Sequence, residues 1–229
     1  MNPTPLAEID LQNQVARTLA ETPLVAVVRT RDDAEAERQA RLFIAGGARM
    51  IEITFTVPGA LDLVRRLLAE RGSLGQDSAP HRIGLGTVTG AERARRAVDA
   101  GAEFLVTPNV SAEAAAVARE AGTYLVVGAL TPTEIVAGRD LGADLIKVFP
   151  LPPVGGPGYL AAVRGPLGDV PMLAAGGFGP EEIPAYRDAG AVAFGIGAPL
   201  LGKSDDETLR RVGGAVAMAR GIRPGEASR

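Results

Sequence analysis

The chain contains no cysteine and no tryptophan, and it has a single histidine. Without cysteine it cannot build a disulfide framework, a thiolate metal site or a cysteine nucleophile. One histidine, His81, argues against a transition-metal site and against serine-histidine-acid catalysis. Because His81 lies in the polar stretch Ala79-Pro80-His81-Arg82, we interpret it as a solvated loop residue. The sequence therefore predicts no metal site.

Long apolar runs and an excess of positive charge are also missing. No apolar run reaches the roughly 20 residues that a membrane helix needs, and the start Met1-Asn2-Pro3-Thr4-Pro5 lacks the pattern of a signal peptide. A net charge of −3 provides no electrostatic footprint for nucleic acid. We therefore expect a cytoplasmic protein that binds neither membrane nor nucleic acid. With 229 residues and 46% hydrophobic content, the chain can bury the core of one large α/β domain.

Lysine is scarce, with two copies against 22 arginines. One of them, Lys147, lies inside Leu145-Ile146-Lys147-Val148-Phe149, a run typical of a strand buried on both faces. A buried lysine can lose its proton, whereas an arginine cannot, and the neutral amine is a nucleophile that forms a Schiff base with a ketone. Lys147 is therefore the strongest indication of chemistry, while Lys203 is interpreted as an ordinary surface residue.

Short apolar runs recur along the chain, spaced mostly by about 20 to 30 residues. They are Leu24–Val28, Met50–Ile53, Ile83–Leu85, Phe104–Val106, Tyr124–Val127, Leu145–Phe149, Met172–Ala175 and Val192–Ile196. The gaps hold segments of helical character, such as Asp33–Ala45, and most gaps end at a glycine that suits the last turn of a helix. This repeat predicts an α/β fold of the (β/α)₈ TIM-barrel type. An open doubly wound sheet is the alternative.

Three further segments add to the expected barrel. Ala7 to Leu19 has the pattern of an extra N-terminal amphipathic helix, and we expect it to cover the barrel floor. The stretch Pro150–Gly158 is rich in proline and glycine and predicts a shaped loop at the active site. No domain boundary is visible, so residues 1–229 are expected to form a single domain, with the barrel proper at about 22–220.

Polar residues gather where the predicted strands end, which is where active sites lie in such barrels. Arg29 follows the first strand, Glu52 lies in the second, and Thr87 follows the third. Strand alternation puts Arg29 on the same face as Val27, and Lys147 on the same face as Leu145. If those faces line the barrel, Arg29, Glu52 and Lys147 converge near its mouth. A buried carboxylate such as Glu52 needs a partner, because burying an unpaired charge is costly.

Glycines form a second group after the last two predicted strands. Gly176 and Gly177 follow the seventh strand, and Gly197 follows the eighth. In such barrels these turns often bind phosphate through backbone N–H groups. The sequence therefore predicts an anion site at these turns, and ordinary glycine-rich turns without a ligand are the alternative.

The order and spacing of several motifs resemble one known family, the class I 2-keto-3-deoxy-6-phosphogluconate (KDPG) and 4-hydroxy-2-oxoglutarate (KHG) aldolases. The resemblance covers about residues 20 to 220. The motifs are Glu52-Ile53-Thr54-Phe55-Thr56-Val57-Pro58, Gly86-Thr87-Val88, Thr107-Pro108-Asn109, Thr131-Pro132-Thr133-Glu134, Lys147-Val148-Phe149-Pro150 and Gly176-Gly177. The resemblance implies a (β/α)₈ barrel that forms a homotrimer and needs no metal or other cofactor. It also implies cleavage of a 2-keto-4-hydroxy acid, the small-molecule partner, into pyruvate and an aldehyde.

The resemblance also assigns roles to residues. Lys147 corresponds to the Schiff-base lysine and Glu52 to the general acid and base. The residues implied to hold the pyruvyl part are Arg29, Thr56 and Thr87 at the carboxylate, with Phe149 beside the imine. Pro108 is implied to be a further substrate-binding residue. The residues implied to bind a substrate phosphate are Gly176, Gly177 and Gly197.

The chain departs from the family pattern at three positions. Close relatives have proline at the position of Val127, a hydroxyl at that of Ala175 and serine at that of Ala198. Two lost hydrogen bonds to a phosphate cost on the order of 3 kcal/mol if nothing replaces them. A non-phosphorylated 2-keto-3-deoxy sugar acid is therefore an alternative substrate. A phosphate-binding barrel isomerase or synthase without an imine and a non-catalytic binding protein are alternative functions.

Overall fold

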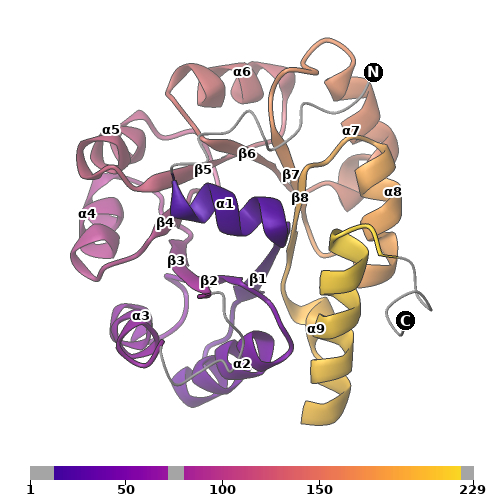
Figure 1. Ribbon diagram of the computed structural model, residues 1–229. Coiled ribbons are helices and arrows are strands. Elements are labelled where there is room, and N and C mark those ends of the chain that lie inside the picture. Colours follow the sequence, from indigo (N-terminus) through magenta and orange to yellow (C-terminus); the bar gives the residue numbers. More distant parts are fainter. Residues whose placement is uncertain (1–12, 72–79, 223–229) are drawn as a thin grey trace.

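The computed structural model describes residues 13–71 and 80–222 of the chain. Eight parallel strands pair in chain order, and β8 also pairs with β1, which closes the barrel seen end-on in Figure 1. The strands are β1 (Leu24–Val28), β2 (Met50–Thr54), β3 (Arg82–Gly86), β4 (Phe104–Val106), β5 (Tyr124–Ala129), β6 (Leu145–Val148), β7 (Met172–Ala175) and β8 (Ala193–Ile196). The predicted barrel is confirmed, and the open sheet considered as an alternative is wrong.

Helices follow the strands and form the outer ring in Figure 1. The α-helices after the strands are α2 (Asp33–Ala45), α3 (Ala60–Ala69), α4 (Ala91–Asp99), α5 (Ala112–Ala121), α6 (Pro132–Asp140), α7 (Gly156–Arg164), α8 (Ile183–Asp188) and α9 (Asp205–Ala219). Short 3₁₀ turns precede three of them: η2 (Pro152–Val154), η3 (Pro180–Glu182) and η4 (Ala198–Leu200). Since η2 and the start of α7 lie within Pro150–Gly158, that stretch is not the single long loop that the sequence suggested.

Local sequence explains where the helices begin and end. Side chains of Asp32, Ser111, Thr131 and Ser204 accept hydrogen bonds from backbone N–H groups in the first turns of α2, α5, α6 and α9. Glycines with positive φ follow the helices, as the sequence predicted. They are Gly47, Gly101, Gly122, Gly142 and Gly190.

Strand alternation separates two apolar layers. Outward-facing residues such as Ile51, Ile53, Ile146 and Val148 pack under the surrounding helices. Inward-facing side chains fill the barrel and are mostly apolar. They include Val25, Met50, Phe104, Val106, Val126, Leu145 and Leu173. Glu52 and Lys147 alternate with the outward-facing residues, so both point into the barrel.

The first helix closes the lower end of the barrel. It spans Gln14–Glu21 as α1, with Asn13 as its N-cap, and Figure 1 shows it lying across the barrel opening. The side chains of Val15, Ala16 and Leu19 join the barrel interior, and the Thr18 hydroxyl accepts a hydrogen bond from Arg82 at the start of β3. The expected floor helix is confirmed for its second half, whereas Ala7 to Gln12 lie outside the described residues.

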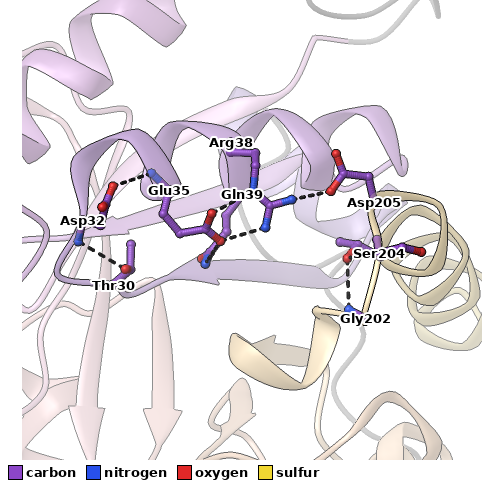
Figure 2. A network of polar contacts seen from close by, with 9 residues as sticks. Thr30, Asp32, Glu35, Arg38, Gln39, Gly202, Ser204 and Asp205 are labelled. Carbon is purple, nitrogen blue, oxygen red and sulfur yellow. Dashed lines mark hydrogen bonds and ion pairs between the residues drawn. The ribbon is translucent and has the colours of Figure 1, made fainter.

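Polar contacts join the first and last helices of the ring. Arg38 on α2 pairs with Glu35 of the same helix and with Asp205 at the start of α9 (Figure 2). Gln39 also donates to Glu35, at 2.8 Å. Arg38 and Asp205 are both solvent-exposed, so their pairing contributes at most about 1 kcal/mol. The pair holds α9 beside α2. These helices follow β8 and β1, the two strands that meet where the barrel closes.

No helix among the described residues is long and apolar enough to cross a membrane.

The interpretation of His81 as a solvated residue is wrong. Its side chain is buried at the start of β3, close to Arg71, Arg82 and Glu103, and its Nε2 atom has no hydrogen-bond partner among the described residues. Burial lowers the pKa of His81 below its ordinary value of 6.5, and the neighbouring arginines act in the same direction. The polar flanking sequence carried no sign that the ring packs inward.

His81 should make folding stability depend on pH. Because its pKa is lower in the folded chain than in the unfolded chain, the unfolded chain binds more protons as the pH falls below about 6.5. The contribution of the neutral ring is therefore complete above that pH and is lost as the pH falls toward the folded-state pKa. Urea unfolding at pH 8 and pH 5.5 should show a smaller loss of stability for His81→Leu than for the unmodified chain. If both proteins lost the same unfolding free energy between pH 8 and pH 5.5, groups other than His81 would cause the acid sensitivity.

Candidate active site

Lys147 and Glu52 meet inside the mouth of the barrel. Lys147 lies on β6 and Glu52 on β2, and Lys147 Nζ is 3.6 Å from Glu52 Oε2. Their side chains are 10% and 2% exposed, so the pair is shielded from water on most sides. The second oxygen, Glu52 Oε1, is buried and has no hydrogen-bond partner among the described residues. The site thus combines an amine with a carboxylate that has an unused proton-accepting atom.

Phe149, which the family resemblance places beside the imine, lies near the Lys147 amine. Lys147 Nζ is 5.5 Å from the centroid of the Phe149 ring. The sequence placed Phe149 within the sixth strand, but β6 ends at Val148, and Phe149 is 39% exposed at the mouth. The ring therefore forms an apolar wall between the amine and solvent.

Arg29 and Thr87 form a second pair at the same end of the barrel. Arg29 follows β1 and donates from Nη2 to the Thr87 hydroxyl at 3.3 Å. Thr87 has a φ of +61°, and it is the only non-glycine residue with positive φ in the described part of the chain. This conformation costs a β-branched residue about 1–3 kcal/mol, and such strain gathers at functional sites. Arg93 on α4 donates to the Thr87 carbonyl at 2.9 Å and so holds the strained residue from behind.

Thr56 and Pro108 also lie beyond the strand ends. Thr56 is exposed after β2, and its hydroxyl is 2.8 Å from that of Thr54. Pro108 is half-buried after β4, and its backbone packs against Gly128, the residue on β5 that pairs with Lys147. No hydrogen bond in the described part of the chain links Arg29, Thr56 or Pro108 to the Lys147 and Glu52 pair.

The three predicted anion-binding glycines lie at the ends of β7 and β8. Gly176 and Gly177 both have positive φ, of 137° and 94°. A Cβ atom at Gly176 would lie 2.7 Å from the Leu151 nitrogen, so glycine lets the turn pack against the loop after β6. Gly197 precedes η4 and lies against Val27 of β1. The turn after β7 therefore packs directly against the segment that follows the lysine strand.

Within residues 13–71 and 80–222, no three histidine, cysteine or acidic side chains are grouped so that they could hold a metal ion.

Sequence reasoning missed three features of this site. Gly86 leaves space for the Glu52 carboxylate, Thr87 adopts a strained conformation, and Arg93 holds the Thr87 carbonyl. Gly86 and Thr87 belong to a motif that the sequence did reveal, but the reason for each residue type is visible only in three dimensions. Arg93 is one arginine among several on α4, and nothing in the sequence distinguishes it.

A buried lysine paired with a carboxylate, at the carboxyl ends of the strands of a (β/α)₈ barrel, is an arrangement suited to an enzyme that forms a Schiff base with a carbonyl substrate. A sequence model of the family "KDPG and KHG aldolase" matches residues 15–214. The chain belongs to this family and is therefore a class I aldolase, a carbon–carbon lyase that yields pyruvate and an aldehyde.

Individual relatives agree with the family. A 2-dehydro-3-deoxy-phosphogluconate aldolase of Zymomonas mobilis is 31% identical over 72% of this chain and 76% of its own. A probable 2-dehydro-3-deoxy-6-phosphogalactonate aldolase of Rhizobium meliloti is 32% identical over 79% of this chain and 82% of its own. A solved structure described as native KDPGal is 28% identical, with a TM-score of 0.76 over 87% of this chain and 97% of its own. The family match and these relatives identify an aldolase, and they exclude the isomerase, synthase and binding-protein alternatives.

Proposed function

We propose that Lys147 is the Schiff-base nucleophile and Glu52 the proton-transfer group for cleavage of a KDPG-type or KHG-type acid. The products are then pyruvate and an aldehyde, either glyceraldehyde 3-phosphate or glyoxylate. The observation that supports this most directly is the distance of 3.6 Å between Lys147 Nζ and Glu52 Oε2 inside a buried mouth. At this distance the carboxylate can take a proton from the ammonium through one water molecule, or directly once substrate binding shortens the contact.

The first half of the reaction makes the imine. The neutral amine of Lys147 adds to the C2 ketone, and the resulting carbinolamine loses water with a proton supplied by Glu52. The product is a cationic iminium, which attracts the electrons of the neighbouring carbon–carbon bond. Burial of Glu52 suits this step, because an anion fixed in a water-poor mouth stabilises the nearby cation more strongly than one in bulk water.

The second half breaks and repairs bonds at C3. Glu52 removes the proton of the C4 hydroxyl, the C3–C4 bond breaks, and its electrons form an enamine attached to Lys147. The aldehyde departs, the protonated Glu52 returns a proton to C3, and water hydrolyses the imine to release pyruvate. Glu52 Oε1 is suited to these transfers, since it makes no competing hydrogen bond within the described residues.

The remaining residues orient the pyruvyl group. In this proposal, Arg29 and the hydroxyls of Thr87 and Thr56 bind the substrate carboxylate, with Arg29 providing a charge-assisted contact. The bond between Arg29 and Thr87 supports this role, because it holds the guanidinium in place before substrate arrives. Phe149 and Pro108 then flank the imine.

Reductive trapping tests the assignment. The unmodified protein is incubated with pyruvate and borohydride, and the peptide that gains the mass of a reduced pyruvyl group is identified. The proposal requires that peptide to carry Lys147. Failure to trap pyruvate at all would overturn it.

A non-phosphorylated substrate is the second candidate, and the turn after β7 favours it. The Gly179 N–H group is already donated to Glu182 Oε1 at 3.1 Å, so a phosphate competes for it with a carboxylate. The Glu181 carboxylate lies against Gly179, so that a Cβ there would be 2.1 Å from Oε1. Two acidic groups thus contact Gly179, two residues after the predicted anion-binding glycine Gly177, and negative charge on this turn disfavours a phosphate dianion. Ala175 and Ala198 offer the phosphate no hydroxyl.

The preference for phosphate should consequently be small. We expect kcat/KM for KDPG to exceed that for its dephosphorylated counterpart by less than about 1,000-fold, which corresponds to about 4 kcal/mol. Ala198→Ser, which restores one hydroxyl at an exposed position, should raise the ratio by about tenfold. A coupled assay of pyruvate release measures both values. A larger ratio in the unmodified protein would show that the glycine turns bind phosphate well without the hydroxyls.

We also propose a homotrimer, and this part of the proposal rests on the family resemblance.

A further inference from the structure

The Glu52 carboxylate lies directly over the backbone of Gly86 on the neighbouring strand. A Cβ atom at Gly86 would lie 1.8 Å from Glu52 Oε1, 2.5 Å from Cδ and 2.6 Å from Cγ. Separations below 3.0 Å essentially never occur for real Cβ atoms. The present position of the carboxylate is therefore available only because residue 86 has no side chain.

The backbone of Gly86 does not itself require glycine. Its φ is not among the positive values of the described residues, so an alanine would meet no conformational strain there. Gly84, two residues earlier on the same strand, differs in its surroundings, because a Cβ there would meet the ring and the carbonyl of Phe104. Of these two glycines of β3, Gly86 is the one whose missing side chain leaves space for the proposed acid–base group.

Neither strand can easily move away from this contact. Gly86 pairs with Thr54 on β2 and with Val106 on β4, and its carbonyl accepts a hydrogen bond from Phe55 at 2.9 Å. Its backbone is therefore held on both sides. The Glu52 side chain is the part that would have to move, and its buried position leaves it little room.

We propose that Gly86 is a positioning residue. Because it has no side chain, it keeps the Glu52 carboxylate in its proton-transfer position, and it makes glutamate the acid required at position 52. The inference rests on the proposed role of Glu52. A methyl group at position 86 would displace the carboxylate from its present position 3.6 Å from Lys147 Nζ. Its nearest contacts would be atoms of Glu52 rather than of Lys147 or Arg29, so binding of pyruvate should suffer less than proton transfer.

Exchange of the methyl protons of pyruvate for deuterium, followed by NMR, isolates the transfer at C3 and needs no aldehyde. Gly86→Ala should slow this exchange by about 100-fold or more, the usual contribution of a general acid–base group. The concentration of pyruvate that half-saturates the exchange should change by less than about threefold. Gly90→Ala is the matched control, because a Cβ at Gly90 meets nothing within 4 Å and its backbone is extended.

A double-mutant cycle separates this role from a general structural one. Glu52→Ala removes Cγ, Cδ and both carboxylate oxygens, and with them every atom of residue 52 that a Cβ at position 86 would meet. Gly86→Ala should then cost less than about threefold in the slower Glu52→Ala background, against about 100-fold in the unmodified chain. An equal cost in both backgrounds would overturn the proposal, since the substitution would then act through the backbone.

Every other outcome also decides the question. If Gly86→Ala does not fold but the double variant does, the change at position 52 has removed the overlap and restored folding. That result supports the proposal. If Glu52→Ala folds but the double variant does not, removing the acid does not relieve the overlap, and the proposal is wrong. An unmodified protein that neither traps nor exchanges pyruvate would overturn the proposed function, whereas normal exchange by Gly86→Ala would overturn only the role of Gly86.

Discussion

Lys147→Arg should abolish both trapping of pyruvate and aldol cleavage. Arginine keeps a positive charge beside Glu52 but cannot supply a neutral nitrogen, so no imine can form. We expect kcat/KM to fall by at least about 10⁴-fold, which corresponds to about 5.4 kcal/mol of transition-state stabilisation. Coupled measurement of pyruvate release gives the rate, and mass spectrometry after borohydride treatment gives the covalent adduct.

The chain offers a matched control for this substitution. Its only other lysine, Lys203, is exposed, so Lys203→Arg makes the same chemical change outside the barrel and should keep full activity and full trapping. A chelator should leave the unmodified enzyme unaffected, because an imine mechanism uses no metal. Full activity in Lys147→Arg, together with no adduct in the unmodified protein, would exclude the Schiff-base assignment.

Glu52→Gln should separate imine formation from the proton transfers. The amide keeps the size of the side chain but cannot accept and return a proton, so we expect kcat to fall by about 10²- to 10⁴-fold. Lys147 remains, and borohydride should still trap pyruvate on it, although more slowly. Exchange of the pyruvate methyl protons, compared with the yield of the trapped adduct, measures the two steps separately.

Stability must be followed in the same variant. Removing one member of a buried ion pair leaves the other uncompensated, which typically costs about 3–5 kcal/mol. Urea unfolding of Glu52→Gln should therefore show a loss, whereas Glu113→Gln on the exposed face of α5 should unfold and react like the unmodified chain. If a folded Glu52→Gln protein exchanged the methyl protons of pyruvate at the normal rate, a group other than Glu52 would be the acid–base catalyst.

The fold was largely predictable because its signals are local. Each strand is a short apolar run, and most helices close at a glycine whose positive φ few other residues tolerate. The limits of single elements were less certain. The third strand extends one residue beyond the prediction at each end, to Arg82 and Gly86, because its pairing with β2 continues past the apolar core of the run.

The central pair of the site was also predictable, since a charge inside an apolar strand is rare enough to indicate a function. Lys147 and Glu52 lie 95 residues apart in the sequence, and only barrel closure brings them to 3.6 Å. The clearance at Gly86 and the strain at Thr87 depend on neighbouring strands and helices. No pattern along the chain encodes such contacts, so a structure was needed to find them.

His81 shows the opposite failure. Its polar neighbours in the sequence indicated solvent, yet the ring packs inward near Arg71 and Glu103. Burial of a single side chain at the start of a strand depends on what the helices place over it. Composition around the residue therefore gave the wrong answer.

Helix α1 restricts how molecules reach the proposed nucleophile. It closes the lower end of the barrel and apolar side chains fill the interior above it, so within residues 13–71 and 80–222 the path to Lys147 runs through the mouth. In the proposed mechanism the pyruvyl group is attached deepest, at Lys147, and the aldehyde carbon lies on the solvent side of it. Steady-state kinetics should therefore be of compulsory order, with pyruvate entering first and leaving last. An aldehyde that arrives early occupies the entrance and competes with pyruvate.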